Sequence, residues 1–195
     1  MGFDSEPKKK ELFVRLFISC NIPKELDEYL RILALQLPET KQTIPKQFDL
    51  TVKFLGNVDN NRLDEIRQRL STIEFHPFET SLETIHVFSE RFIKIVWVGL
   101  TESEKFGHLH TQVEEALFPL FERDTRFQPH ITIARIKSLK DKTGFLEALS
   151  QIRVKPVQFT VDKLILVESE LSAAGATHTP LYEYSAIERQ RRKRA

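Results

Sequence analysis

Short apolar stretches with alternating inward and outward positions predict a series of β-strands along the chain. They are rich in β-branched and aromatic residues, which suit a pleated, half-buried surface. Two neighbouring stretches joined near Ser89–Arg91 have the form of an antiparallel hairpin. The predicted strands are residues 13–19, 49–56, 78–88, 92–100, 129–136, 154–169 and 176–187.

Between these strands, apolar residues recur every three or four positions, which predicts amphipathic helices. Pro23 begins the first helix and Pro38 ends it, because proline suits the first turn of a helix and disrupts its interior. Asn60 or Asn61 can cap the second helix and Ser103 the third. The predicted helices are residues 23–37, 60–73, 104–121 (shortened by its proline) and 139–152.

Strands and helices alternate, but several neighbouring strands pair as hairpins. This combination favours an α+β fold with mostly antiparallel sheets over a doubly wound parallel sheet. A polar-x-Thr strand begins at Asp49 and again at His130, 81 residues later. The weak repeat predicts a bilobal molecule, with two similar lobes facing a central cleft and helices on the outside. We expect residues 1–188 to form this single domain.

The net charge of +1 is unevenly distributed along the 195 residues. Five basic residues lie within positions 189–195, so residues 1–188 carry a net charge of −4, that is, +1 minus 5. A body of this charge is not a basic nucleic-acid platform, so any RNA contact must be confined to an end or a terminal phosphate. The segment 189–195 is predicted to be a disordered solvated tail, with a nucleic-acid arm as the alternative.

A single cysteine, Cys20, lies inside an apolar run and is expected to be a buried small residue. One cysteine excludes an internal disulfide and a cysteine-based zinc site, and it fits a reducing compartment. No stretch approaches the roughly 20 apolar residues that a bilayer span needs. The polar start lacks the apolar region of a signal peptide. We therefore expect a soluble cytoplasmic protein that has no membrane contact.

Two strands carry polar side chains opposite their buried residues. Residues i and i+2 of a strand share a face, so His130 and Thr132 point the same way, as do Asp49 and Thr51. If the two strands lie side by side, the threonine hydroxyls can donate to phosphate oxygens and the imidazole can move a proton near neutral pH. On these residues alone, a pair on the protein surface is the more common explanation of each motif.

The segments RLFIS, DLTVKFLGNV, IVWVGL, FQPHITIARIK and KLILVESEL occur in the order found in the RNA 2′,3′-cyclic phosphodiesterases. From about Phe13 to Ile187 the chain resembles this family, formerly called 2′-5′ RNA ligases. It is a branch of the two-histidine phosphoesterases, which have a His-x-Thr motif in each of two lobes. The resemblance implies hydrolysis of RNA 2′,3′-cyclic phosphate ends to a 2′-phosphate, without metal or other cofactor, and allows a reverse 2′-5′ ligation without ATP. The implied partners are such RNA ends or nucleotides, and no obligatory protein partner is evident.

Carried over residue by residue, the resemblance implies that His130 is the proton acceptor that activates water. Thr51 and Thr132 match threonines that hold phosphate oxygens. Arg135 matches a family arginine near the phosphate, although regular strand alternation puts it on the face opposite His130. Asp49 falls where the family has its first histidine, the proton donor to the leaving oxygen.

Asp49 departs from the family motif at a position that bears on activity. A carboxylate that is ionised at neutral pH donates a proton poorly. Three interpretations stay open: an impaired enzyme, an enzyme with a shifted pH optimum, or a residue introduced in place of histidine. The alternative function is a non-catalytic module that binds a nucleotide or RNA end in the same cleft.

The remaining candidates carry less weight. Phe48 and Phe127 flank the two motifs and can stack on a nucleobase, although core packing is the more common role of phenylalanine. We expect Trp97 in the core. The sequence has no G-x-x-x-x-G-K-[ST] motif for binding ATP. The other histidines lack partners at metal-ligand spacing, so no metal site is expected; they are His76, His86, His108, His110 and His178.

Overall fold

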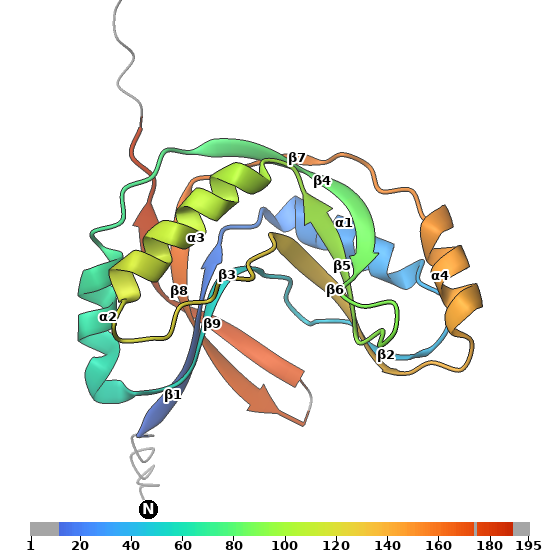
Figure 1. Cartoon of the computed structure of the whole chain (residues 1–195), viewed down its shortest axis with the longest axis horizontal. Coiled ribbons are helices and arrows are strands. Elements are labelled where there is room, and N and C mark those ends of the chain that lie inside the picture. The colour runs from blue at the N-terminus through green and yellow to red at the C-terminus, as the bar shows by residue number, and fades with distance from the viewer. Residues whose placement is uncertain (1–11, 174, 189–195) are drawn as a thin grey trace, which may run out of the picture.

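The computed structural model describes residues 12–173 and 175–188, which form an α+β fold with two antiparallel sheets and four α-helices (Figure 1). The predicted fold class is confirmed. The strands are β1 (Phe13–Cys20), β2 (Lys41–Thr43), β3 (Leu50–Asp59), β4 (Phe78–Val87), β5 (Ile95–Leu100), β6 (His130–Ser138), β7 (Gln158–Val161), β8 (Lys163–Ser172) and β9 (Gly175–Ser185). The helices are α1 (Lys24–Leu35), the short 3-10 helix η1 (Asn60–Arg62), α2 (Leu63–Leu70), α3 (Ser103–Leu117) and α4 (Lys142–Gln151).

The two sheets do not correspond to the two halves of the chain. One sheet has the order β3-β1-β8-β9, so it joins strands from both ends of the sequence. The other has the order β2-β6-β5-β4-β7. The two polar-x-Thr strands, β3 and β6, therefore belong to different sheets and do not pair side by side.

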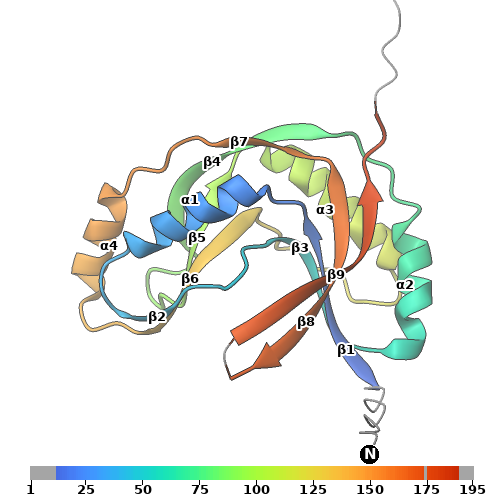
Figure 2. The same cartoon turned by 180° about the vertical axis from the view of Figure 1, so that it is seen from behind.

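The helices lie on the outside of the two sheets. Helices α2 and α3 contact each other beside the four-stranded sheet, and α3 also contacts β3 (Figure 1). Helix α1 contacts β6 of the five-stranded sheet, as the view from behind shows (Figure 2). In both views the β8–β9 hairpin extends well beyond the body of the molecule.

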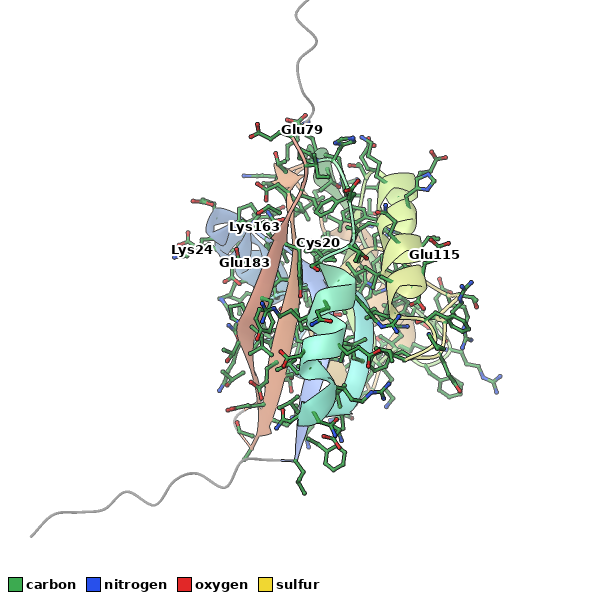
Figure 3. All side chains as sticks on the ribbon, turned by 90° about the vertical axis from the view of Figure 1, so that its left-hand side faces the viewer. Cys20, Lys24, Glu79, Glu115, Lys163 and Glu183 are labelled. Atoms are coloured by element: carbon green, nitrogen blue, oxygen red, sulfur yellow. The ribbon has the colours of Figure 1, made fainter. Side chains whose placement is uncertain are left out.

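The predicted apolar stripes form the core. Leu26, Leu30 and Leu33 of α1 are almost fully buried, as are Ile66 and Leu70 of α2. Cys20 is only 3% exposed and lies among the strands (Figure 3). Burial raises the pKa of its thiol well above the ordinary value, so Cys20 behaves as a small apolar residue, as predicted. Trp97 is also buried, as predicted.

One predicted strand was wrong, whereas the effects predicted for two prolines were confirmed. The predicted strand 154–169 is divided at Asp162, where the chain leaves β7 in one sheet and enters β8 in the other. Helix α3 ends at Leu117, two residues before Pro119, because proline cannot continue a helix. Pro180 lies in β9, which is an edge strand, as its proline predicted.

The predicted tail, residues 189–195, lies outside the described residues. None of the helices in the described part of the chain has the length and apolar character that a membrane span requires.

Candidate functional site

A β-bulge in β6 brings Arg135 onto the same face as His130 and Thr132. Thr132 and Ala134 pair with consecutive residues of β5, so Ile133 has no partner in that strand. As a result, the side chains of Ile133 and Ala134 are both buried in the core. The next residue, Arg135, is then exposed. Regular alternation predicted the opposite face for Arg135, and the extra residue of the bulge is why that prediction was wrong.

A matching bulge occurs in β3. Its register with β1 passes over Val52, and both Val52 and Lys53 turn inward. Phe54, which regular alternation would bury, is 64% exposed and lies on the same side as Thr51. The two motif strands therefore carry equivalent local irregularities.

The inward turn of Lys53 is stabilised by a buried ion pair. Its Nζ donates hydrogen bonds to Glu114 Oε1 of α3 at 2.7 Å and to the carbonyl of Glu122 at 2.9 Å. Glu114 also accepts from the backbone N–H of Asp124 at 3.2 Å. His110 Nε2 lies 3.2 Å from Glu114 Oε1, and burial lowers the pKa of His110. This network fixes β3 against α3 and the loop that precedes β6.

A cavity of about 370 Å³ lies between the two sheets, a size within the range of small-ligand sites. Strand β6 contributes His130, Thr132 and Arg135 to its lining. Strand β3 contributes Thr51, and Asp49, which directly precedes that strand, also lines the cavity. The structure thus brings together the five residues that the two motifs predicted. The β8–β9 hairpin and the loop after β2 complete its walls.

The cavity is basic, although the body of the protein is acidic. Arg15, Lys46 and Arg135 line it, and Asp49 is its one carboxylate among the described residues. Hydroxyl groups of Thr51 and Thr132 add hydrogen-bond donors. Basic side chains and hydroxyls around a confined space are the groups that bind phosphate.

The hydrogen bonding of His130 determines which of its ring nitrogens can accept a proton. Nδ1 lies 2.7 Å from the carbonyl oxygen of Gln128, which can only accept, so Nδ1 carries the hydrogen. Nε2 of the neutral ring then holds the lone pair. Burial is the largest cause that lowers the pKa of His130, the charge of Arg135 acts in the same direction, and the Gln128 carbonyl opposes them. Together these effects favour the neutral form of the His130 ring.

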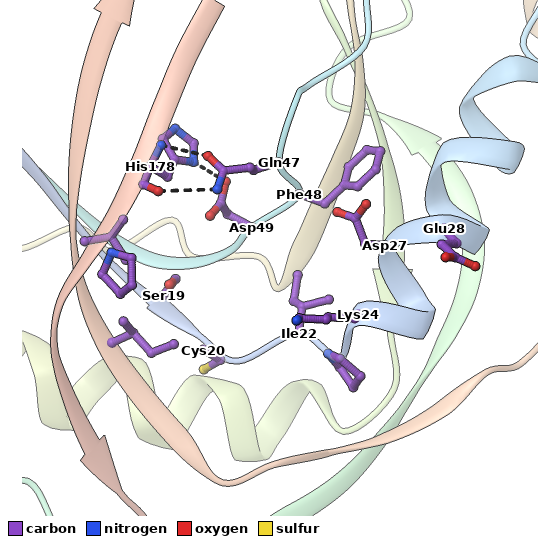
Figure 4. Close-up of a pocket in the computed structure, with 14 residues that line it drawn as sticks. Ser19, Cys20, Ile22, Lys24, Asp27, Glu28, Gln47, Phe48, Asp49 and His178 are labelled. Carbon is purple, nitrogen blue, oxygen red and sulfur yellow. Dashed lines mark hydrogen bonds and ion pairs between the residues drawn. The ribbon is translucent and has the colours of Figure 1, made fainter.

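Asp49 is paired with His178 of β9, a residue that we did not connect with the site from the sequence. His178 Nδ1 lies 2.7 Å from Asp49 Oδ2 (Figure 4). The backbone of His178 is held by the side chain of Gln47, which accepts from its N–H at 2.7 Å and donates to its carbonyl at 3.3 Å. The ring also packs edge-on against Phe17, with centroids 4.9 Å apart. His178 lines the same cavity as His130.

The two phenylalanines proposed for base stacking lie elsewhere. Phe48 is 7% exposed, and the guanidinium of Arg31 lies over its ring. Phe127 stacks on His110, with centroids 4.4 Å apart. Neither residue lines the cavity, whose aromatic residues are Phe17 and Phe54. Both rings have packing contacts of their own, so base stacking by Phe48 or Phe127 stays a prediction.

The other histidines have local roles. His76 Nδ1 lies 2.8 Å from the carbonyl of Ile187, and His86 Nε2 lies 2.7 Å from the hydroxyl of Thr84. Within residues 12–173 and 175–188, no group of three or more histidine, cysteine, aspartate or glutamate side chains is placed to hold a metal ion.

Known proteins resemble the chain over most of its length. The family model described as the 2′-5′ RNA ligase superfamily matches residues 50–173. A relative from Archaeoglobus fulgidus named RNA 2′,3′-cyclic phosphodiesterase is 31% identical over 129 residues, which are 64% of this chain and 73% of the relative. A protein of the same name from Methanothermobacter thermautotrophicus is 26% identical over 181 residues, 86% of this chain and 96% of the relative. The crystal structure of TT0787 from Thermus thermophilus superposes with a TM-score of 0.70 at 26% identity, covering 88% of this chain and 97% of that chain.

Proposed function

The chain belongs to the 2′-5′ RNA ligase superfamily, and on that premise we propose that it hydrolyses RNA ends or nucleotides that carry a 2′,3′-cyclic phosphate. The observation that carries the proposal is the convergence of His130, Thr132, Arg135 and Thr51 on one basic cavity. Relatives that align with most of the chain are named for this activity. A cyclic phosphate end offers one negative charge and a ribose, which suits a confined basic cavity better than an extended nucleic-acid surface.

The phosphate would lie between the two motif strands. Hydroxyls of Thr51 and Thr132 would donate to its non-bridging oxygens at about 2.5–3.0 Å, the usual O–H···O distance. Arg135 would neutralise the charge that develops on those oxygens during attack. Both threonines come from strands whose bulges determine which neighbouring side chains face the cavity.

His130 would act as the general base. Its Nε2 would accept a proton from water, and the water oxygen would attack phosphorus. The bond between phosphorus and the ribose 3′ oxygen would break, which leaves a 2′-phosphate and requires a proton for the departing oxygen. In this proposal the acid–base work is done by side chains of the protein.

The experiment is hydrolysis of a 2′,3′-cyclic nucleotide, and of a short RNA ending in a cyclic phosphate, by the purified chain in EDTA. We expect a 2′-phosphate product, identified by chromatography against both isomers. His130→Ala should lower the rate by about 10²–10⁴-fold, the usual contribution of one positioned acid–base group. His108→Ala, at an exposed position on α3, is the matched control and should keep the parent rate. Adding an RNA with a 5′-hydroxyl tests the reverse 2′-5′ ligation in the same mixture.

The alternative, a non-catalytic nucleotide-binding module, makes a different prediction. It requires saturable binding of the cyclic nucleotide with no turnover, and an affinity that Thr51→Val lowers. Loss of turnover in EDTA, with recovery on adding one divalent ion, would contradict the metal-free part of the proposal.

A further inference from the structure

We infer that His178 is the proton donor of this site and that Asp49 positions it, so that the pair replaces the histidine expected at the first motif. The inference rests on the proposed hydrolysis of cyclic phosphates. It assigns a role to a residue of β9, far in the sequence from either motif.

The geometry of the pair leaves one ring nitrogen available. Nδ1 of His178 is buried and lies 2.7 Å from Asp49 Oδ2. The contact is short but is not aligned as a hydrogen bond, and Nδ1 has no hydrogen-bond partner within the described residues. Because Nδ1 faces the carboxylate, Nε2 is the atom of the ring that can exchange a proton with a ligand.

His178 is half-buried and is held by contacts with two other segments of the chain. Gln47 binds both its N–H and its carbonyl, and Phe17 packs against the ring. These contacts come from the loop before β3 and from β1, so two other segments hold His178 in place. Positioning of this kind is what a general acid requires, since its proton must reach one particular oxygen.

The location of the pair argues against a purely structural role. The side chains of Asp49 and His178 are 21% and 20% exposed, and both line the cavity that contains His130. Asp49 alone would repel a phosphate in that cavity. A proton on the neighbouring His178 would compensate that charge. The cavity then presents a histidine on β6 and a histidine on β9, from opposite sheets.

The chemical step balances with these two histidines. His130 Nε2 gains one proton from the attacking water, and the new P–O bond forms. The P–O bond to the ribose 3′ oxygen breaks, and that oxygen takes one proton from His178 Nε2. One water is consumed, and proton exchange with solvent restores both histidines. Asp49 neither gives nor takes a proton; its carboxylate faces Nδ1 and orients the ring, as the carboxylate does in a catalytic triad.

The decisive experiment moves the histidine. His178→Gln should lower kcat for the cyclic nucleotide by about 10²–10⁴-fold while KM changes little, because a lost general acid affects the transition state more than binding. The double variant Asp49→His with His178→Gln should recover a large part of kcat, because it returns a histidine to the family position. If His178 only supported the fold, a histidine placed at position 49, in the loop before β3, would not restore the activity. His108→Gln is the control for the loss of a histidine from an unrelated surface.

Asp49 has its own test as a positioning residue. Asp49→Asn should lower kcat by at least about tenfold with KM nearly unchanged, because Nδ1 of His178 loses the carboxylate that orients the ring for proton donation. Asp49→Glu should be faster than Asp49→Asn, since it keeps a carboxylate at this position.

The outcomes separate this inference from the function on which it rests. No turnover by the parent chain would overturn both. Turnover by the parent that needs His130 and survives His178→Gln would overturn the inference alone. Loss of activity in His178→Gln without recovery in the double variant would assign His178 a structural role and would also overturn it. Binding of a 2′-nucleotide by every variant, measured by calorimetry, shows that each one is folded.

Discussion

Arg135 and His130 share one face of β6 because Ile133 is accommodated in a bulge between them. The charge of Arg135 is consequently one of the causes that lower the pKa of His130, after burial. A single extra residue in a strand therefore influences the protonation of the proposed base. It also places a guanidinium where a phosphate would lie.

The first prediction concerns the acidic limb of the pH–rate profile. A base works in its deprotonated form, so kcat/KM should rise with pH through the lowered pKa of free His130, below the ordinary value of 6.5. Arg135→Met removes a positive charge and should move that limb to higher pH. Arg123→Met, at an exposed position before β6, should leave the limb in place. An NMR titration of the His130 ring provides a check that does not depend on turnover.

The second prediction concerns phosphate binding. Thr51→Val and Thr132→Val each remove a hydroxyl and keep the shape of the side chain. A hydrogen bond to a charged group contributes about 1.5–3 kcal/mol, so each variant should bind a 2′-nucleotide roughly 10- to 100-fold more weakly. Thr111→Val on α3 is the control, because its hydroxyl bonds to the helix carbonyl of Gly107. Equal affinities for all variants in calorimetry would place the phosphate elsewhere.

The third prediction concerns the buried ion pair of β3. Lys53→Met leaves Glu114 buried without its cation and should lower the free energy of unfolding by about 3–5 kcal/mol. Combining it with Glu114→Leu should recover much of that loss, because the unpaired charge is removed as well. Denaturant unfolding measures both. Lys163→Met breaks the exposed pair with Glu183 (Figure 3) and should barely change the unfolding midpoint.

The fourth prediction concerns stability in mild acid. The pKa values of His110 and His130 are lowered in the folded state, so the unfolded chain binds more protons once the pH falls to about 6.5. The free energy of unfolding should therefore decrease as the pH falls from 7 through 6.5. The decrease should level off once the pH lies below the lowered pKa values of the two histidines in the folded state. His110→Gln should make this decrease smaller, whereas His108→Gln should not. A decrease that is unchanged in His110→Gln would show that other groups cause it.

The alternation of polar and apolar residues was enough to predict the position of His130 and Thr132 within a strand. It could not predict which face of the strand Arg135 and Phe54 occupy. A bulge reverses the alternation of faces, and the hydrophobic pattern does not show where a bulge occurs. The helical stripes of α1 and α2 were predictable because burial requires them.

The pairing of His178 with Asp49 could not be predicted from the sequence for a different reason. It depends on the route by which β8 and β9 return to β1, and no local pattern encodes that route. The division of the predicted strand 154–169 at Asp162 belongs to the same problem, since it is the point where the chain changes sheets.

Strand β1 lies between β3 and β8, so its second edge stays uncovered until a strand about 150 residues later in the chain has been made. During synthesis, β1 and β3 can pair early, but the wall that carries His178 is absent until β9 has left the ribosome. A chain that ends before β8 would expose the unpaired edge of β1. Nascent chains of this protein therefore acquire the complete basic cavity, and with it any activity, only after β9 has emerged.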